Sequence, residues 1–196
     1  MIKLQMERQS KNSSRPAAQS LFLACLFIVL ATGYSFGQSK TIIDEWGSVQ
    51  APKPPELKLV TLDPKTSALL VLDIVKQTCN SQRRPRCLDT IPKIQALLKQ
   101  ARAKGIAVVH SITTAATPAD IAMELTPLEG EPIVKTSADK FFKTDLEKIL
   151  TDKGIKEVVV VGTAAQGAVL NTASQAAFRG LKVIIPVDGM SAENTY

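Results

Sequence analysis

The chain has 196 residues, of which 45% are hydrophobic and 21% charged, so it suits one folded domain with an appendage and is not a largely disordered chain. Aromatic residues make up only 5%, which argues against a stacking platform for single-stranded nucleic acid. The formal charge is +6, but four basic residues and one acidic residue before residue 20 supply half of it, and the remaining 20 basic and 17 acidic residues are interspersed. We therefore expect no nucleic-acid partner.

The first 37 residues predict a secretory signal peptide. Residues 1–19 are polar and basic, residues 21–31 form an unbroken apolar run, and the Ser-Phe-Gly of residues 35–37 matches a small-x-small cleavage pattern. The apolar run is shorter than the roughly 20 residues that span a bilayer. We expect a mature chain that begins near Gln38 and is exported, to the periplasm or out of the cell. An uncleaved N-terminal anchor is the alternative, and only that alternative predicts membrane attachment.

Export changes how the cysteines are interpreted. Cys25 lies in the predicted signal peptide, whereas Cys79 and Cys87 bracket a polar stretch that predicts a loop. In an oxidising compartment, two cysteines that close a short loop predict a disulfide, with a pair of free thiols as the alternative. A metal site needs further His or Cys ligands, and the chain has a single histidine, His110, so we predict no metal and no other cofactor.

The sequence after the signal peptide divides into an arm and a domain. Residues 38–57 contain three prolines and predict an extended arm, and residues 58–196 predict the domain. Within the domain, apolar runs predict strands, and amphipathic stretches with capping residues predict helices. The predicted strands are residues 67–73, 106–110, 132–135, 157–161 and 182–187, and the predicted helices are residues 90–104, 144–154 (opened by a capping box at Thr144) and 167–179.

Continuous apolar strands that alternate with amphipathic helices predict an α/β fold with three layers, in which helices cover both faces of a mainly parallel sheet. Such sheets bind ligands beyond the carboxyl ends of their strands. The residues predicted at those ends are Asp73, His110, Lys135 and the turn at residues 162–164. Each also has an ordinary structural explanation: an acid that caps a loop, an imidazole bonded to backbone, a solvated lysine and a turn of small residues.

The residues at this edge suit acid–base chemistry. A lysine beside a partly buried carboxylate stabilises the charged form, and the pair can relay a proton. Residues 162–168 (Gly-Thr-Ala-Ala-Gln-Gly-Ala) bring unhindered backbone N–H groups to the start of a helix, where a developing negative charge is stabilised. The alternative explanation is that these small residues let the helix pack closely on the sheet.

Three segments together resemble the isochorismatase-like cysteine hydrolases. They are residues 69–73 (Leu-Leu-Val-Leu-Asp), Lys135 with the following residues 139–146 (Asp-Lys-Phe-Phe-Lys-Thr-Asp-Leu), and residues 159–173. The resemblance runs from about Leu59 to the C-terminus. It implies a Rossmann-like sheet, an Asp–Lys–Cys triad at the strand edge and a cis peptide bond without proline that shapes an oxyanion hole.

Mapped onto this chain, the resemblance makes Asp73 the acid, Lys135 the lysine and the bond between Thr163 and Ala164 the cis peptide. The oxyanion hole then consists of the backbone N–H groups of Ala164 and Ala168. The residues expected to contact a small-molecule substrate are His110, Phe141, Thr163, Ala164 and Gly167.

The third member of the triad departs from the family pattern. The family cysteine lies six residues after the glycine of the third segment, and here that residue is Ala168. Alanine forms no thioester, so we expect this chain not to use the amidase mechanism of the cysteine-containing members. Two hypotheses follow. The protein is a hydrolase that, like isochorismatases that cleave a vinyl ether, delivers a proton without a thiolate, or it is an inactive relative that binds a small carbonyl or carboxylate compound.

The end of the sequence also differs from the family pattern. The family fold continues after the last predicted strand with another helix and an edge strand, whereas this sequence ends at Tyr196. We therefore expect a domain truncated at that helix and strand, either because the sequence is a fragment or because the protein is a natural short form. A short form leaves apolar sheet surface uncovered, which favours a homo-oligomer or low stability.

Overall fold

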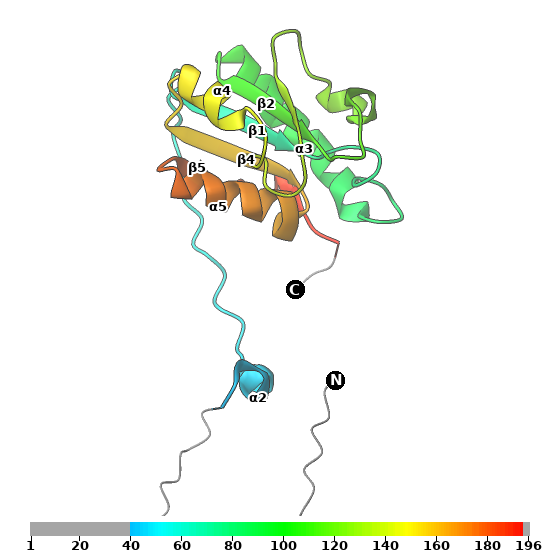
Figure 1. Cartoon of the computed structure of the whole chain (residues 1–196), viewed down its shortest axis with the longest axis vertical. Helices are drawn as coiled ribbons and strands as arrows, with labels where there is room; N and C mark the ends of the chain where they lie inside the picture. Colours follow the sequence, from blue (N-terminus) through cyan, green and yellow to red (C-terminus); the bar gives the residue numbers. More distant parts are fainter. Residues whose placement is uncertain (1–39, 194–196) are drawn as a thin grey trace, which may run out of the picture. The chain divides into compact units, whose positions relative to one another are not determined.

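The computed structural model describes residues 40–193, so the predicted signal peptide lies outside the described residues (Figure 1). The chain divides into two units, with the boundary between Leu57 and Lys58. In the first unit, the described residues include a short helix, α2 (Ile42–Glu45), followed by a 3-10 turn, η1 (Trp46–Ser48). A capping box between Thr41 and Asp44 starts α2. The predicted arm is therefore helical over this part rather than extended throughout.

The second unit is built on a parallel sheet. Its strands are β1 (Ser67–Leu72), β2 (Ala107–Ile112), β3 (Ile133–Lys135), β4 (Glu157–Thr163), β5 (Lys182–Ile184) and β6 (Met190–Ser191). The strand order is β3-β2-β1-β4-β5, and the short β6 pairs with the carboxyl end of β4. Every pairing between these strands is parallel, in the order typical of doubly wound α/β sheets. The predicted α/β fold is confirmed.

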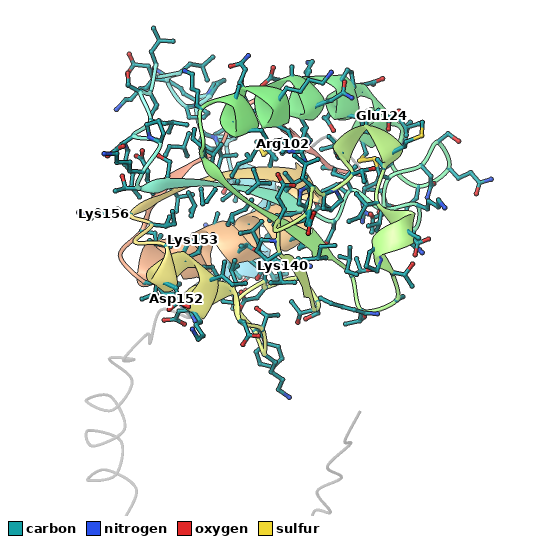
Figure 2. All side chains as sticks on the ribbon, turned by 90° about the horizontal axis from the view of Figure 1, so that it is seen from above. Arg102, Glu124, Lys140, Asp152, Lys153 and Lys156 are labelled. Carbon is teal, nitrogen blue, oxygen red and sulfur yellow. A yellow bond between two sulfur atoms is a disulfide. The ribbon has the colours of Figure 1, made fainter. Side chains whose placement is uncertain are left out.

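Helices cover both faces of the sheet. In Figure 2, α3 (Pro85–Ala103) lies on one side of the strands, and α4 (Leu146–Asp152) and α5 (Leu170–Phe178) lie on the other. Leu69 and Val71 of β1 pack toward α3, whereas Leu70 and Leu72 pack toward α4 and α5. Because both faces are covered, every residue of β1 and β4 is buried, which accounts for their continuous apolar sequences.

Several element boundaries differ from the predicted ones. Helix α3 begins at Pro85, before the predicted residue 90, because proline at the first helical position already has the required φ and lacks only an N–H that would be unpaired there. The predicted capping box at Thr144 is wrong: its hydroxyl donates to the Lys140 carbonyl and accepts from the Leu146 N–H. Strand β5 ends at Ile184, two residues before Pro186, which has no N–H to donate to a sheet.

The carboxyl ends of β1 and β4 approach each other closely at Gly162. This glycine pairs with Leu72 and has a φ of 134°, in the region that side-chain-bearing residues avoid. A Cβ atom at Gly162 would lie 2.1 Å from the carbonyl oxygen of Leu72. Glycine is therefore required here, and it fixes the relative positions of two strand ends, one followed by Asp73 and the other by the turn at Ala164.

We predict that Gly162→Ala destabilises the domain by about 3 kcal/mol or prevents folding, because the added methyl group meets backbone that cannot move aside. The matched control is Gly130→Ala. Gly130 also has a positive φ, 83°, but nothing lies within 4 Å of an added Cβ, so only the conformational cost of about 1 kcal/mol applies. Urea unfolding of both variants measures the difference, and equal losses would contradict the proposed close approach.

Candidate active site

Asp73 lies directly after β1 at the carboxyl edge of the sheet. Its φ of 55° is left-handed, a conformation that aspartate adopts more readily than most residues and that often marks a functional position. The Asp73 side chain is only 6% exposed. Its Oδ1 accepts a hydrogen bond of 2.8 Å from the hydroxyl of Ser111, on β2, and its backbone N–H donates to the Ser111 carbonyl. Asp73 is thus a buried carboxylate in a fixed orientation.

Lys140 is the cationic partner of Asp73. Its side chain is fully buried, and its Nζ lies 2.7 Å from Asp73 Oδ2. The same nitrogen donates to the carbonyl oxygens of Ser137 at 2.6 Å and Thr136 at 3.3 Å. The three N–H groups of the ammonium therefore have three acceptors. The Lys140 backbone N–H donates to the hydroxyl of Thr172 on α5, which ties this lysine to the helical layer.

The predicted pairing of Asp73 with Lys135 is wrong. Lys135 ends the edge strand β3 with its side chain exposed, and its register partner on β2 is Ile112. Ser111, which holds Asp73, has Val134 as its partner. Because successive residues of a strand point to opposite faces, Lys135 lies on the other face of the sheet from Ser111. The segment after β3 turns back and brings Lys140 to the carboxylate instead.

Burial dominates the protonation behaviour of Asp73. It raises the pKa of the carboxyl above its ordinary value, and the opposing effects of Lys140, Ser111 and the charge of Arg84 offset it only in part. A carboxyl in this setting holds a proton at a higher pH than an exposed aspartate does. A carboxyl whose pKa is raised in this way is better suited to donate a proton than an exposed aspartate is.

The turn after β4 contains an unusual backbone. The peptide bond between Thr163 and Ala164 is cis, at the position that the family resemblance implied. The π-type turn η4 (Ala165–Val169) follows, and Gly167 within it has non-helical dihedral angles. The N–H groups of Gly167 and Val169 both donate to the Ala164 carbonyl. The turn thus reverses the chain tightly between β4 and α5.

The predicted residues of this turn are all buried or partly buried. The Thr163 hydroxyl accepts a hydrogen bond of 3.0 Å from the Ser191 hydroxyl on β6. Ala164 is 8% exposed and Ala168 is 4% exposed, and the Ala168 methyl group packs in the core on the α4 and α5 side of the sheet. Gly167 is partly buried. A methyl group therefore occupies the position at which the resemblance predicts a thiol.

His110 does not lie where a substrate contact was predicted. Strand β2 continues to Ile112, so His110 is an internal strand residue, 1% exposed, and its register partner is Val71 on the α3 side. Its Nε2 lies 3.0 Å from Glu131 Oε2, and Glu131 also binds Arg102 of α3. The adjacent Ser111 contacts Asp73. A one-residue step along a strand reverses the face, which accounts for this error.

Phe141 also differs from its predicted role. Its ring is 6% exposed and packs in the core with Leu146 and Leu150 of α4. The Arg179 guanidinium lies over the ring, 4.4 Å from its centroid. The ring therefore stabilises the packing beneath α4 and α5, next to the segment that carries Lys140, rather than facing a ligand.

Cys79 and Cys87 form the predicted disulfide. It joins the segment after β1 to the first turn of α3, and both cysteines are buried. Both cysteines among residues 40–193 are therefore oxidised. Within the same residues, no group of three or more His, Cys, Asp or Glu side chains is arranged to hold a metal ion.

The structure is thus a doubly wound α/β protein with a buried carboxylate–ammonium pair and a cis turn at the carboxyl edge of its sheet, where proteins of this class bind their ligands. Residues 67–196 match the family model described as the Isochorismatase domain, and the chain belongs to the isochorismatase family.

Three comparisons illustrate this membership. The chain is 33% identical over 142 residues to the "Secreted isochorismatase effector Isc1" of Verticillium dahliae, covering 66% of this chain and 75% of the relative. It is 32% identical over 132 residues to the "Streptothricin hydrolase" of Streptomyces noursei, covering 62% of this chain but only 52% of that relative. An isochorismatase-like hydrolase from Alkaliphilus metalliredigens superposes with a TM-score of 0.62 at 28% identity, covering 66% and 83% of the two chains. The chain is thus a member of a family of hydrolases.

We predict that Lys140→Met destabilises the protein by about 3–5 kcal/mol, because it leaves the buried Asp73 carboxylate without its counter-ion. Lys135→Met is the matched control, since it makes the same chemical change at an exposed lysine and is expected to alter stability by no more than about 0.5 kcal/mol. Chemical unfolding at neutral pH compares the two, and a larger loss for Lys135→Met would disprove the assignment of Lys140.

We predict that the ion cluster around Glu131 makes stability depend on acid pH. Burial alone would raise the pKa of Glu131, but hydrogen bonds from Arg102, the Leu128 N–H and His110 outweigh it and lower the pKa to about 2. In the unfolded chain the pKa of Glu131 has its ordinary value of 4.5. The ionised Glu131 carboxylate therefore stabilises the folded protein fully above pH 4.5, and this stabilisation is lost as the pH falls toward 2. Unfolding of wild type and Glu131→Gln at pH 7 and pH 3 measures it. The variant should lose less stability on acidification, and parallel losses would contradict this role.

Proposed function

We propose that the protein is a hydrolase of small molecules in which Asp73 and Lys140 supply acid–base catalysis without a cysteine nucleophile. The observation that carries this proposal is the buried ion pair at the carboxyl edge of the sheet, with Nζ and Oδ2 2.7 Å apart. Ligands of doubly wound sheets bind at this edge. Perturbed, buried ionisable groups are characteristic of catalytic sites, and general acid–base catalysis contributes typically about 10²–10⁴-fold to rate.

The hydrogen bonds support different roles for the two members of the pair. The Lys140 ammonium has three protein acceptors, one of which is Asp73, so it is suited to holding Asp73 in place. Asp73 has the raised pKa and is the better proton carrier. We therefore assign proton transfer to Asp73 and its positioning to Lys140 and Ser111.

Without a free thiol among the described residues, the proposed mechanism cannot use a cysteine nucleophile from them. Among residues 40–193, both cysteines are in the disulfide, and Ala168 has no nucleophilic atom. A bond whose cleavage begins with protonation of the substrate, as in a vinyl ether, needs no covalent intermediate with the protein. Asp73 gives its proton to the vinyl carbon, water adds to the resulting oxocarbenium ion and returns a proton to the Asp73 carboxylate, and the hemiketal so formed breaks its C–O bond to release an alcohol and a carbonyl compound. The family membership and the relatives named as hydrolases support a hydrolytic reaction of this kind.

A second candidate function is binding without turnover. The buried methyl group of Ala168 favours it, since the site keeps its acid, its ammonium and its cis turn but has no nucleophile there. In that case the protein binds a small carbonyl or carboxylate compound. The two candidates share the same ligand site and differ only in whether a bond is broken.

We also propose that the protein works outside the cytoplasm, in the periplasm or as a secreted protein. Two observations support export: the disulfide, which persists in oxidising compartments, and the similarity to a protein named as a secreted effector. No helix in residues 40–193 is long and apolar enough to cross a membrane. A homo-oligomer remains a prediction from the sequence.

We predict that Asp73→Asn lowers kcat/KM by about 100-fold or more, because the amide keeps the shape of the carboxyl but carries no transferable proton. The assay uses purified protein with a panel of small vinyl ethers, esters and amides. Lys135→Met serves as the control and should retain wild-type turnover, since Lys135 lies on the other face of the sheet. Wild-type protein that binds a panel compound and never converts it would instead establish the binding function.

A further inference from the structure

Arg84 is a buried cation that the proposed chemistry does not use. It lies within the loop closed by the Cys79–Cys87 disulfide and immediately precedes α3, and its side chain is only 9% exposed. Its Nη1 donates to the Thr78 carbonyl at 3.2 Å. Its Nε is buried and has no hydrogen-bond partner among the described residues. One edge of this guanidinium is therefore unsatisfied inside the protein.

The carboxylate nearest to this edge is a weak partner. Glu193 Oε2 lies 3.8 Å from Arg84 Nη2, beyond hydrogen-bond distance, and the Glu193 side chain is 50% exposed. Burial lowers the pKa of Arg84, but arginine starts from so high a value that the guanidinium stays charged. A buried charged donor without an acceptor is costly, so the Arg84 Nε–H calls for an acceptor, which a ligand, an ion or a water can supply.

Arg84 belongs to the same edge of the sheet as Asp73. Thr78 connects the two residues, because its hydroxyl donates to the Asp73 carbonyl and its own carbonyl accepts from Arg84. On the other side, Glu193 follows β6, which pairs with Thr163 just before the cis bond. Arg84 thus lies between the end of β1 and the end of β6, near enough for its charge to act on Asp73.

The four charges at this edge sum to zero, but only one of the two pairs is in contact. Asp73 and Lys140 form a buried ion pair, whereas the guanidinium of Arg84 has only the half-exposed Glu193, 3.8 Å away. Helix α3 adds a partial positive charge at its N-terminus, and its first turn contains no acidic residue. A guanidinium with free N–H groups on one edge has the geometry to bind a carboxylate with two parallel hydrogen bonds.

We propose that Arg84 binds a carboxylate group of the ligand and so makes the protein selective for small carboxylates. The disulfide contributes by holding the loop that carries Arg84 against the end of β1. This inference rests on the proposed function for the location of the ligand, but it concerns recognition rather than the chemical step. It can therefore be tested by binding alone.

The experiment compares each carboxylate with its primary amide. Aliphatic and aromatic pairs, such as propionate with propionamide and benzoate with benzamide, are titrated into the full mature protein by calorimetry and ligand-observed NMR. We expect at least one carboxylate to bind about tenfold more tightly than its amide, the effect of one charge-assisted contact. Arg84→Gln should abolish this preference, and Arg84→Lys should retain only part of it.

Two matched controls separate recognition from general charge and from stability. Arg86→Gln removes the same charge from an exposed arginine two residues away and should keep the preference. Glu193→Gln removes the only carboxylate within 4 Å of the Arg84 guanidinium among the described residues and should keep or strengthen the preference. Unfolding curves of Arg84→Gln establish that the variant is folded under the binding conditions.

The possible results are distinct. Wild type that never prefers a carboxylate over its amide, or folded Arg84→Gln that keeps the preference, overturns the inference. A carboxylate preference that depends on Arg84 in a protein without turnover supports the inference and rejects the proposed hydrolase. Turnover that depends on Asp73, with no preference for carboxylates, supports the hydrolase and rejects the role of Arg84.

Discussion

The buried ion pair between Asp73 and Lys140 is the constraint on which the carboxyl edge of this sheet depends. Removing two charges from water is costly, and their attraction compensates only when the remaining polar atoms are also satisfied. Here Ser111 satisfies the second oxygen of the carboxylate, and two backbone carbonyls satisfy the ammonium. Each partner thus requires a particular course of the chain: a left-handed residue after β1 and a turn after β3 that folds back over the sheet.

The sheet and the helical layer of α4 and α5 meet at this pair. The close approach of β4 to β1 at Gly162 fixes the strand end that leads into Asp73. Thr172 of α5 accepts from the backbone of Lys140, and the ring of Phe141 anchors the next residue in the core beneath α4. The pair is therefore positioned from the sheet and from the helical layer together. A site built in this way is rigid without help from exposed loops.

The sequence allowed the architecture and Asp73 to be predicted, because both depend on periodic patterns: apolar runs for buried strands, and an acid at the end of one of them. The disulfide followed from the short spacing of Cys79 and Cys87. The choice between Lys135 and Lys140 could not be made in this way, since both lie in one motif and only the register of β3 and the turn after it decide which lysine is buried. The prediction for His110 was wrong for a related reason. The end of β2 was placed two residues early, so His110 was assigned to the strand end and to the wrong face of the sheet.

The charges at the carboxyl edge of the sheet relate the alanine at position 168 to the unsatisfied guanidinium of Arg84. On the mapping proposed for Ala168, a relative with cysteine there can place a thiolate, a negative charge, at the end of β4. In this chain a methyl group takes that place, and the negative charge is lost while the charge of Arg84 is present. A site in which a buried guanidinium has no carboxylate of the described residues within hydrogen-bond distance is better suited to an anionic ligand than to a nucleophilic residue. On this mapping, an uncharged methyl group at Ala168 both closes the covalent route and favours recognition of a carboxylate, so the two proposals depend on the same position.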